Sequence, residues 1–147
     1  MGTIDSSPEF ARLVVVGPGP LRPRCQRRCR ELGIEESVTF EGPVPSDRLP
    51  GYYCGSSVYV SPAVGRESMG IVLVEAMACG RAVVASDIPG YNEVIQHDTN
   101  GLLVPQRNPV SLSQAVVSVL ENKRTRERLE LGALARADDF AWTRIAA

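Results

Sequence analysis

The sequence predicts a doubly wound α/β domain built on a parallel sheet, on three observations. Five short runs rich in β-branched and apolar residues alternate with segments of helical periodicity along the 147 residues. The first run, 12-RLVVVG-17, is a short β-branched run that ends in glycine, as in a strand that a parallel sheet buries on both faces. Turn-forming residues separate the runs from the helical segments. The predicted strands are 12–17, 38–42, 57–62, 82–86 and 102–105.

The helical segments have recognisable starts and ends. In the first helix, Pro23 suits the first turn, and Gly33 is well placed as the residue that ends it. Gly80 closes the third helix, and Asn108 caps the helix that begins at Pro109. The predicted helices cover 22–32, a short stretch within 43–56, 71–79, 91–96, 109–120 and 123–137.

Composition and charge exclude several classes of protein. The net charge of −1 and the pI near 5.9 predict no binding of nucleic acid, and five arginines between Arg22 and Arg30 are interpreted as a solvated helix face. No apolar run approaches the ~20 residues that a membrane span needs, and no signal peptide is evident. We therefore expect a cytoplasmic protein, with residues 1–10 as a loose lead-in or a cloning remnant.

The cysteines and the single histidine predict no metal site. The four cysteines form no CxxC pair and are expected to be reduced thiols. Cys25 and Cys29 lie one helical turn apart, but two further ligands are missing nearby. His97 lies in a polar segment, 97-HDTNG-101, and is interpreted as a surface turn residue.

The junction 62-PAVGRESMG-70, between the third strand and the next helix, is a candidate phosphate site. Ligands of open parallel sheets bind beyond the carboxyl ends of the strands, at helix N-termini. Backbone N–H groups from Ser68 to Ile71 are predicted donors to such a ligand, and Gly70 allows its close approach. A purely structural helix start capped by Ser68 explains the same residues.

Glu75 is the only charged residue between Ser68 and Gly80, in a helix that is apolar on nearly every side. We therefore expect a buried carboxylate, which costs several kcal/mol unless it meets hydrogen-bond donors. Its side chain should lean toward the helix N-terminus. A nucleotide whose phosphates dock there would place its ribose hydroxyls near this carboxylate.

The segment 67-ESMGIVLVEAMACG-80, followed by 81-RAVVASDIPG-90 and 100-NGLLVP-105, resembles the donor-binding, C-terminal half of the retaining glycosyltransferases with the GT-B fold. This large family includes sucrose synthases and many mannosyltransferases, and the resemblance runs from Leu13 to Ile145. The stretch 61-SPAVGRESMGIVLVEAM-77 is most similar to the bacterial phosphatidylinositol mannosyltransferases, which use GDP-mannose. The resemblance implies a Rossmann-like domain over residues 11–147.

The resemblance also implies roles for individual residues. Glu67, as the catalytic residue, would accept hydrogen bonds from the donor sugar, and Glu75 would hold the ribose hydroxyls. Val44 would line the base pocket, and Met69 stands where the family usually has phenylalanine. No cofactor or metal is expected, since the nucleoside-diphosphate sugar, GDP-mannose or a UDP-hexose, is itself the substrate. The implied substrate-binding residues are Glu67, Ser68, Met69, Gly70, Ile71, Glu75 and Val44.

Parts that the family has are not found in this sequence. The arginine and lysine that hold the donor diphosphate cannot be assigned in residues 1–10, and neither the first strand-helix unit nor the N-terminal acceptor domain is present. By the strand order 3-2-1-4-5-6 the absent strand would be central, which would expose two sheet edges and allow strand exchange or oligomers. The chain is thus expected to be a fragment or split form. For the full-length enzyme, peripheral membrane association is expected.

Two functions remain open from the sequence. The parent protein is predicted to be a glycosyltransferase that transfers a hexose, mannose or glucose, to an acceptor with retention of configuration. The isolated chain is predicted to be inactive, because the acceptor would not be held near the donor carbon. The alternative is a noncatalytic module that binds a nucleotide or a partner.

Overall fold

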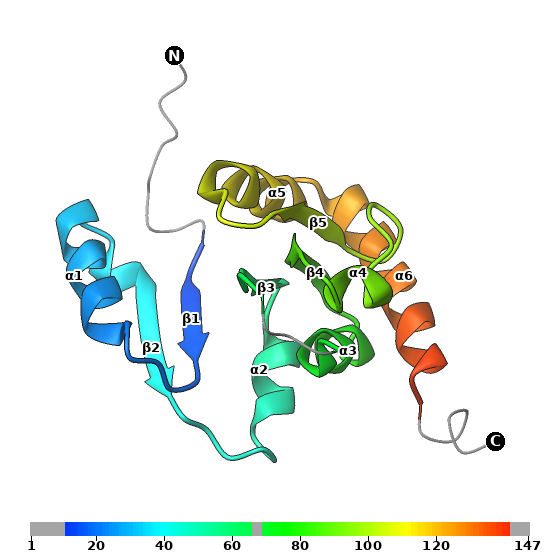
Figure 1. The fold of residues 1–147 in the computed structure, drawn as a ribbon, viewed down its shortest axis with the longest axis horizontal. Helices are drawn as coiled ribbons and strands as arrows, with labels where there is room; N and C mark the ends of the chain where they lie inside the picture. The colour runs from blue at the N-terminus through cyan, green and yellow to red at the C-terminus, as the bar shows by residue number, and fades with distance from the viewer. Residues whose placement is uncertain (1–10, 66–68, 142–147) are drawn as a thin grey trace. The chain divides into compact units, whose positions relative to one another are not determined.

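The chain divides after Arg48 into two units, residues 1–48 and residues 49–147, and each contains its own parallel sheet (Figure 1). The computed structural model describes residues 11–65 and 69–141. Both sheets are flanked by helices, which confirms the α/β class.

The first unit is a single strand-helix-strand element. Strand β1 (Leu13–Val16) pairs in parallel with β2 (Val38–Gly42), and α1 (Arg22–Leu32) and a 3-10 helix, η1 (Glu35–Ser37), connect them. Gly33 ends α1 as predicted, because its φ of 68° lies in the left-handed region. No residue of α1 is buried, in agreement with a solvated arginine face.

The second unit holds a three-stranded parallel sheet in the order β3-β4-β5. The strands are β3 (Val58–Ser61), β4 (Ala82–Asp87) and β5 (Leu102–Pro105). The central strand β4 is buried along Ala82 to Ser86. The helices of this unit are α2 (Leu49–Gly55), α3 (Ile71–Ala78), α4 (Tyr91–Val94), α5 (Pro109–Glu121) and α6 (Lys123–Asp139).

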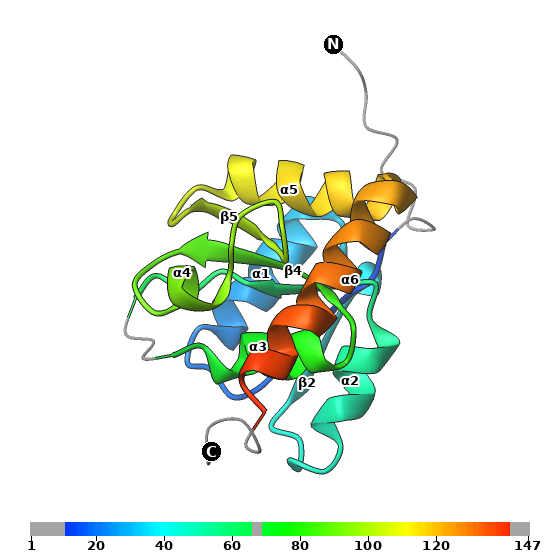
Figure 2. The same ribbon diagram turned by 90° about the vertical axis from the view of Figure 1, so that its right-hand side faces the viewer.

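Alternation along β4 divides the core of this unit between the two faces of the sheet. Val83 and Ala85 pack with α3 and α4 on one face, and Val84 packs with α5 on the other. Helix α6 contributes to both clusters, with Leu129 in the second and Ala133 in the first. Figures 1 and 2 show α5 and α3 on opposite sides of the sheet.

The turn before β5 is held by hydrogen bonds of Asn100 and packs closely against α6. The buried side chain of Asn100 accepts a hydrogen bond from the Gln96 N–H (2.9 Å) and donates one to the Val94 carbonyl (3.3 Å). A Cβ atom built on Gly132 of α6 would lie 2.1 Å from the Thr99 carbonyl oxygen. The helix therefore reaches the turn only because residue 132 has no side chain.

Most predicted helix and strand boundaries agree with the structure within two residues, because local signals set them. The Asn108 side chain caps α5 by accepting from the Ser111 N–H at 2.9 Å, as predicted. The Asn122 side chain caps α6 in the same way, accepting from the Thr125 N–H at 3.0 Å, which was not predicted. Helix α4 ends before Ile95, whose backbone is extended, and so stops short of the predicted boundary.

Candidate functional site

Helix α3 begins after Gly70, its N-cap residue, which has φ 60° and ψ 47° and, as a glycine, no side chain that could cap the helix. Among the described residues, no side chain accepts a hydrogen bond from the first turn. The Leu73 N–H donates to the Gly70 carbonyl at 2.8 Å, whereas the N–H groups of Ile71 and Val72 have no partner within the helix. Unpaired donors at the positive end of a helix dipole favour an anionic ligand.

The sequence prediction placed the donors from Ser68 to Ile71, with a structural helix start capped by Ser68 as the alternative. Ser68 and Glu67 lie outside the described residues. Gly70 has a left-handed backbone, so the helix itself begins at Ile71, and the assignment of the donors remains a prediction.

A buried hydroxyl pair holds the backbone of this region. The Oγ atom of Ser61, the last residue of β3, lies 2.7 Å from the hydroxyl of Tyr91, the first residue of α4. The Tyr91 side chain is 1% exposed and packs against Gly70, where an added Cβ would lie 2.8 Å from the ring. The start of α3 is thus packed against the start of α4.

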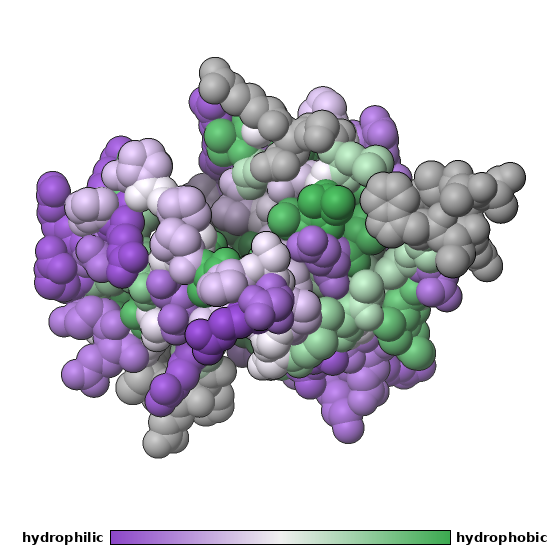
Figure 3. Space-filling model, turned by 90° about the horizontal axis from the view of Figure 1, so that it is seen from below, coloured by the Kyte–Doolittle hydropathy of each residue, from purple (hydrophilic) through white to green (hydrophobic). Residues whose placement is uncertain are grey.

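Glu75 lies on the exposed side of α3, so the expectation of a buried carboxylate is wrong. The described residues around α3 bury one face of the helix: Leu73, Ala76 and Met77 are fully buried, whereas Ile71 is 59% exposed. Ile71 and Glu75 are four residues apart and therefore share the open face, with Glu75 one turn beyond the helix start. The side of the molecule on which α2 and α3 lie shows hydrophobic surface beside hydrophilic surface (Figure 3).

The hydroxyl of Tyr53, on α2, donates a hydrogen bond to Oε2 of Glu75 at 2.9 Å. Burial, together with this hydrogen bond, holds the pKa of Tyr53 well above its usual range, so the phenol remains a donor. Among the described residues, no hydrogen bond or ion pair engages the other carboxylate oxygen. Glu75 is therefore oriented by one contact and keeps an oxygen for a ligand's hydroxyl groups.

The structure brings together some of the predicted site residues. Met69 and Gly70 lie immediately before α3, Ile71 begins it, and Glu75 is on its exposed face. Val44 is partly exposed and belongs to the other unit, in the segment after β2. Tyr53, Ser61 and Tyr91 were not predicted as site residues, because their partners are 22 and 30 positions away along the chain.

Other titratable residues have structural partners. The Nδ1 atom of His97 accepts a hydrogen bond from the Leu103 N–H at 3.0 Å, in agreement with the interpretation of His97 as a turn residue. The Arg128 guanidinium hydrogen-bonds to Asp98 and holds the pKa of that carboxyl below its usual value. Within residues 11–65 and 69–141, no group of three His, Cys, Asp or Glu side chains is arranged to hold a metal ion. No helix in the same ranges is long and apolar enough to span a membrane.

Curated proteins similar to this chain are glycosyltransferases. An uncharacterised glycosyltransferase from Methanocaldococcus jannaschii is 37% identical over 92% of this chain and 35% of its own length. A phosphatidyl-myo-inositol mannosyltransferase from Mycobacterium leprae is 35% identical over the same shares. A GDP-mannose-dependent phosphatidylinositol monomannoside mannosyltransferase from Mycobacterium tuberculosis is 34% identical over 75% of this chain and 30% of its own. The chain thus spans about a third of the length of these relatives.

Solved structures of GT-B glycosyltransferases confirm the Rossmann-like fold. Sucrose-phosphate synthase from Thermosynechococcus elongatus superposes with a TM-score of 0.84 at 31% identity, over 92% of this chain and 36% of that one. HepE from Anabaena, in complex with UDP-glucose, superposes with a TM-score of 0.81 at 25% identity, over 87% of this chain and 36% of HepE. The family described as "Glycosyl transferases group 1" matches residues 3–122, and this chain therefore belongs to that family.

Proposed function

We propose that residues 11–147 are the donor-binding half of a glycosyltransferase. The whole protein would transfer a hexose, mannose or glucose, from a nucleoside-diphosphate sugar to an acceptor with retention of configuration. The observation that carries this proposal is the position of Glu75 on the exposed face of α3, one turn beyond the helix start at Gly70. A donor diphosphate at that start and its ribose beside Glu75 fit this arrangement.

Each part of the site has a distinct physical task. The N–H groups at the start of α3 stabilise the negative charge that builds up on the leaving nucleoside diphosphate. Glu75 accepts hydrogen bonds from the ribose hydroxyls, and Tyr53 keeps its carboxylate in place. Glu67 accepts from the hydroxyls of the donor sugar. Val44 contacts the base. Interactions that become stronger as the diphosphate departs lower the activation barrier of the transfer. Interactions that are equally strong in the bound substrate and in the transition state only tighten binding.

The comparisons support a nucleotide-sugar donor and favour two identities for it. One relative is named as GDP-mannose-dependent, and HepE was crystallised with UDP-glucose. A thermal-shift panel of GDP, UDP, ADP and their mannose and glucose conjugates distinguishes them, because a ligand that binds only the native state raises the melting temperature. We expect the largest shift with GDP-mannose, as in the mannosyltransferase branch.

Glu75→Gln should lower nucleotide affinity at least several-fold while folding is unchanged. The substitution keeps the shape but weakens charge-assisted hydrogen bonds, which are typically worth ~1.5–3 kcal/mol. Folding should be unaffected because the side chain is exposed. Titration calorimetry with the best ligand of the panel measures the affinity, and Glu121→Gln, an exposed glutamate at the end of α5, is the matched control. An unchanged affinity with reduced stability would make Glu75 a structural residue.

Glu67→Ala should weaken binding of the nucleotide sugar more than binding of the free nucleoside diphosphate. The reason is that Glu67 is assigned to the sugar and not to the nucleotide. The dissociation constants of the nucleotide sugar and of the free nucleoside diphosphate are measured for the wild-type chain and for the variant. The fold-loss of affinity caused by the substitution is then compared between the two ligands. Equal weakening of both ligands would contradict the assignment of Glu67.

A further inference from the structure

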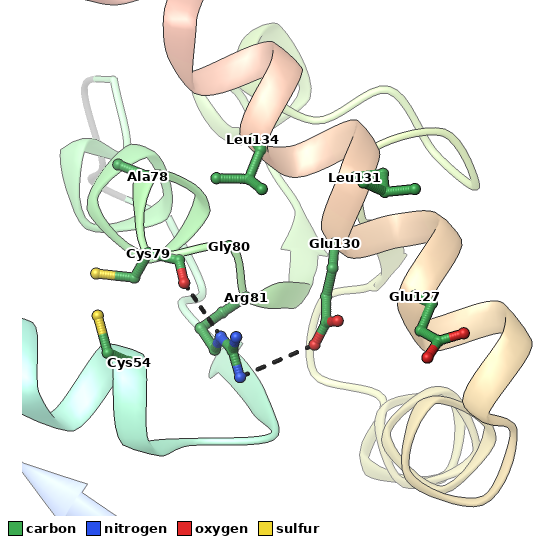
Figure 4. A pocket seen from close by; sticks show the side chains of 9 residues that line it. All are labelled: Cys54, Ala78, Cys79, Gly80, Arg81, Glu127, Glu130, Leu131 and Leu134. Atoms are coloured by element: carbon green, nitrogen blue, oxygen red, sulfur yellow. Dashed lines mark hydrogen bonds and ion pairs between the residues drawn. The ribbon is translucent and has the colours of Figure 1, made fainter.

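A cavity of about 680 Å³ lies at the end of α3 away from the proposed donor site (Figure 4). Helices α2, α3 and α6 contribute to its walls. Two of the lining residues are cysteines: Cys54 from α2 and Cys79, which follows the last residue of α3. The proposed function uses neither residue, and the sequence prediction considered them only as reduced thiols.

The two cysteines face one another. Both line the same cavity, and their sulfur atoms lie beside each other at its wall (Figure 4). All four cysteines of the chain are free. A disulfide requires two cysteines whose side chains point toward one another, as those of Cys54 and Cys79 do (Figure 4).

The surroundings give the two thiols different reactivities. Cys54 is exposed, whereas Cys79 is only partly exposed. Burial, and then the hydrogen bond with Cys54, raise the pKa of Cys79 to about 11, with the nearby Arg81 acting in the opposite direction. Because Cys54 is the more exposed of the two, it is the thiol that an oxidant from solution reaches first.

We propose that Cys54 and Cys79 are a reversible oxidation site that hydrogen peroxide converts to a disulfide. The Cys54 thiolate attacks one oxygen of the peroxide, which gives a sulfenic acid on Cys54 and releases hydroxide. The Cys79 sulfur then attacks the Cys54 sulfur, the S–S bond forms, and the S–O bond breaks. The departing hydroxide and the proton of Cys79 form water. Overall, two thiols lose two electrons and one peroxide is reduced to two waters.

The disulfide would connect α2 to α3 beside an existing contact. Tyr53 directly precedes Cys54, and its partner Glu75 lies one helical turn before Cys79, so the proposed disulfide would lie beside the Tyr53–Glu75 hydrogen bond. A crosslink that closes a loop of this length restricts the unfolded chain and should raise the melting temperature by about 10 °C. The inference concerns chemistry of the cysteines and does not depend on the proposed function.

The test exposes the purified full chain to hydrogen peroxide at a few equivalents and follows intact mass and melting temperature. We expect a loss of two hydrogens, a single crosslinked peptide containing Cys54 and Cys79 after digestion without reductant, the higher melting temperature, and full reversal by dithiothreitol. The matched control is C25S/C29S, which removes the two cysteines of α1 and should behave as wild type. C54S and C79S, tested separately, should show no mass loss and no thermal shift.

Three results would overturn the inference. These are a crosslinked peptide containing Cys25 or Cys29 in place of the proposed pair, a disulfide between two copies of the chain, or overoxidation of Cys54 without any disulfide in the wild-type chain. If C54S fails to fold, Cys54→Ala in the C25S/C29S background replaces it; this variant leaves Cys79 as the only thiol and should form no disulfide within the chain.

Discussion

Replacing Gly70 with alanine is expected to lower the free energy of unfolding by about 2–5 kcal/mol. The backbone of Gly70 has φ 60°, and for a residue with a Cβ atom the left-handed region costs about 1–2 kcal/mol. The new methyl would also lie 2.8 Å from the Tyr91 ring and 3.0 Å from Leu73 Cδ1. Both neighbours are buried, and the Tyr91 hydroxyl is bonded to Ser61, so the ring cannot turn away.

The substitution Gly80→Ala separates the two causes of the stability loss expected for Gly70→Ala, which are the left-handed backbone and the clash of the new methyl group. Gly80 has φ 68°, close to that of Gly70, but its nearest contacts, from Leu134, are at ordinary distances of 3.5 Å or more. It should therefore show the backbone cost alone. Urea unfolding followed by circular dichroism measures both variants. Equal losses for the two glycines would mean that Tyr91 does not crowd the start of α3.

Gly132→Ala is expected to destabilise the second unit by about 3 kcal/mol or more, although alanine is the better helix former by about 1 kcal/mol. The added Cβ would lie 2.1 Å from the Thr99 carbonyl oxygen, a distance that no packed atoms tolerate. The turn cannot retreat easily, because the Asn100 side chain is bonded to Gln96 and Val94. Helix α6 must therefore move away from the turn.

The control for Gly132 is Gly51→Ala, at a helical position of α2 where an added Cβ would meet nothing within 4 Å. That change should leave stability unchanged or raise it by up to about 1 kcal/mol. Urea unfolding of both variants under the same conditions gives the comparison. A Gly132→Ala variant that is more stable than the wild-type chain would show that α6 does not approach Thr99 as closely as the structure indicates.

The candidate site was partly predictable. Gly70, Ile71 and Glu75 could be selected because a lone carboxylate stands one turn beyond a glycine-containing helix start. The apolar composition of α3 predicted burial of Glu75, and this was wrong because the described neighbours cover only one face of the helix. Periodicity shows which residues share a face, but not how many faces other elements will cover. The roles of Glu67 and Val44 remain predictions.

The sequence by itself determined the α/β class, the order of strands and helices, and local features such as the Gly33 end of α1 and the Asn108 cap of α5. These depend on residues within about four positions of one another, so a short stretch of chain contains all the interacting groups. The tertiary structure alone decided which residues meet across long separations. The Tyr53–Glu75 and Ser61–Tyr91 contacts, the Cys54–Cys79 pair, and the approach of Gly132 to Thr99 all join residues more than twenty positions apart. Such contacts form only when the sheet and its helices pack together, because no local pattern in the sequence specifies the partner.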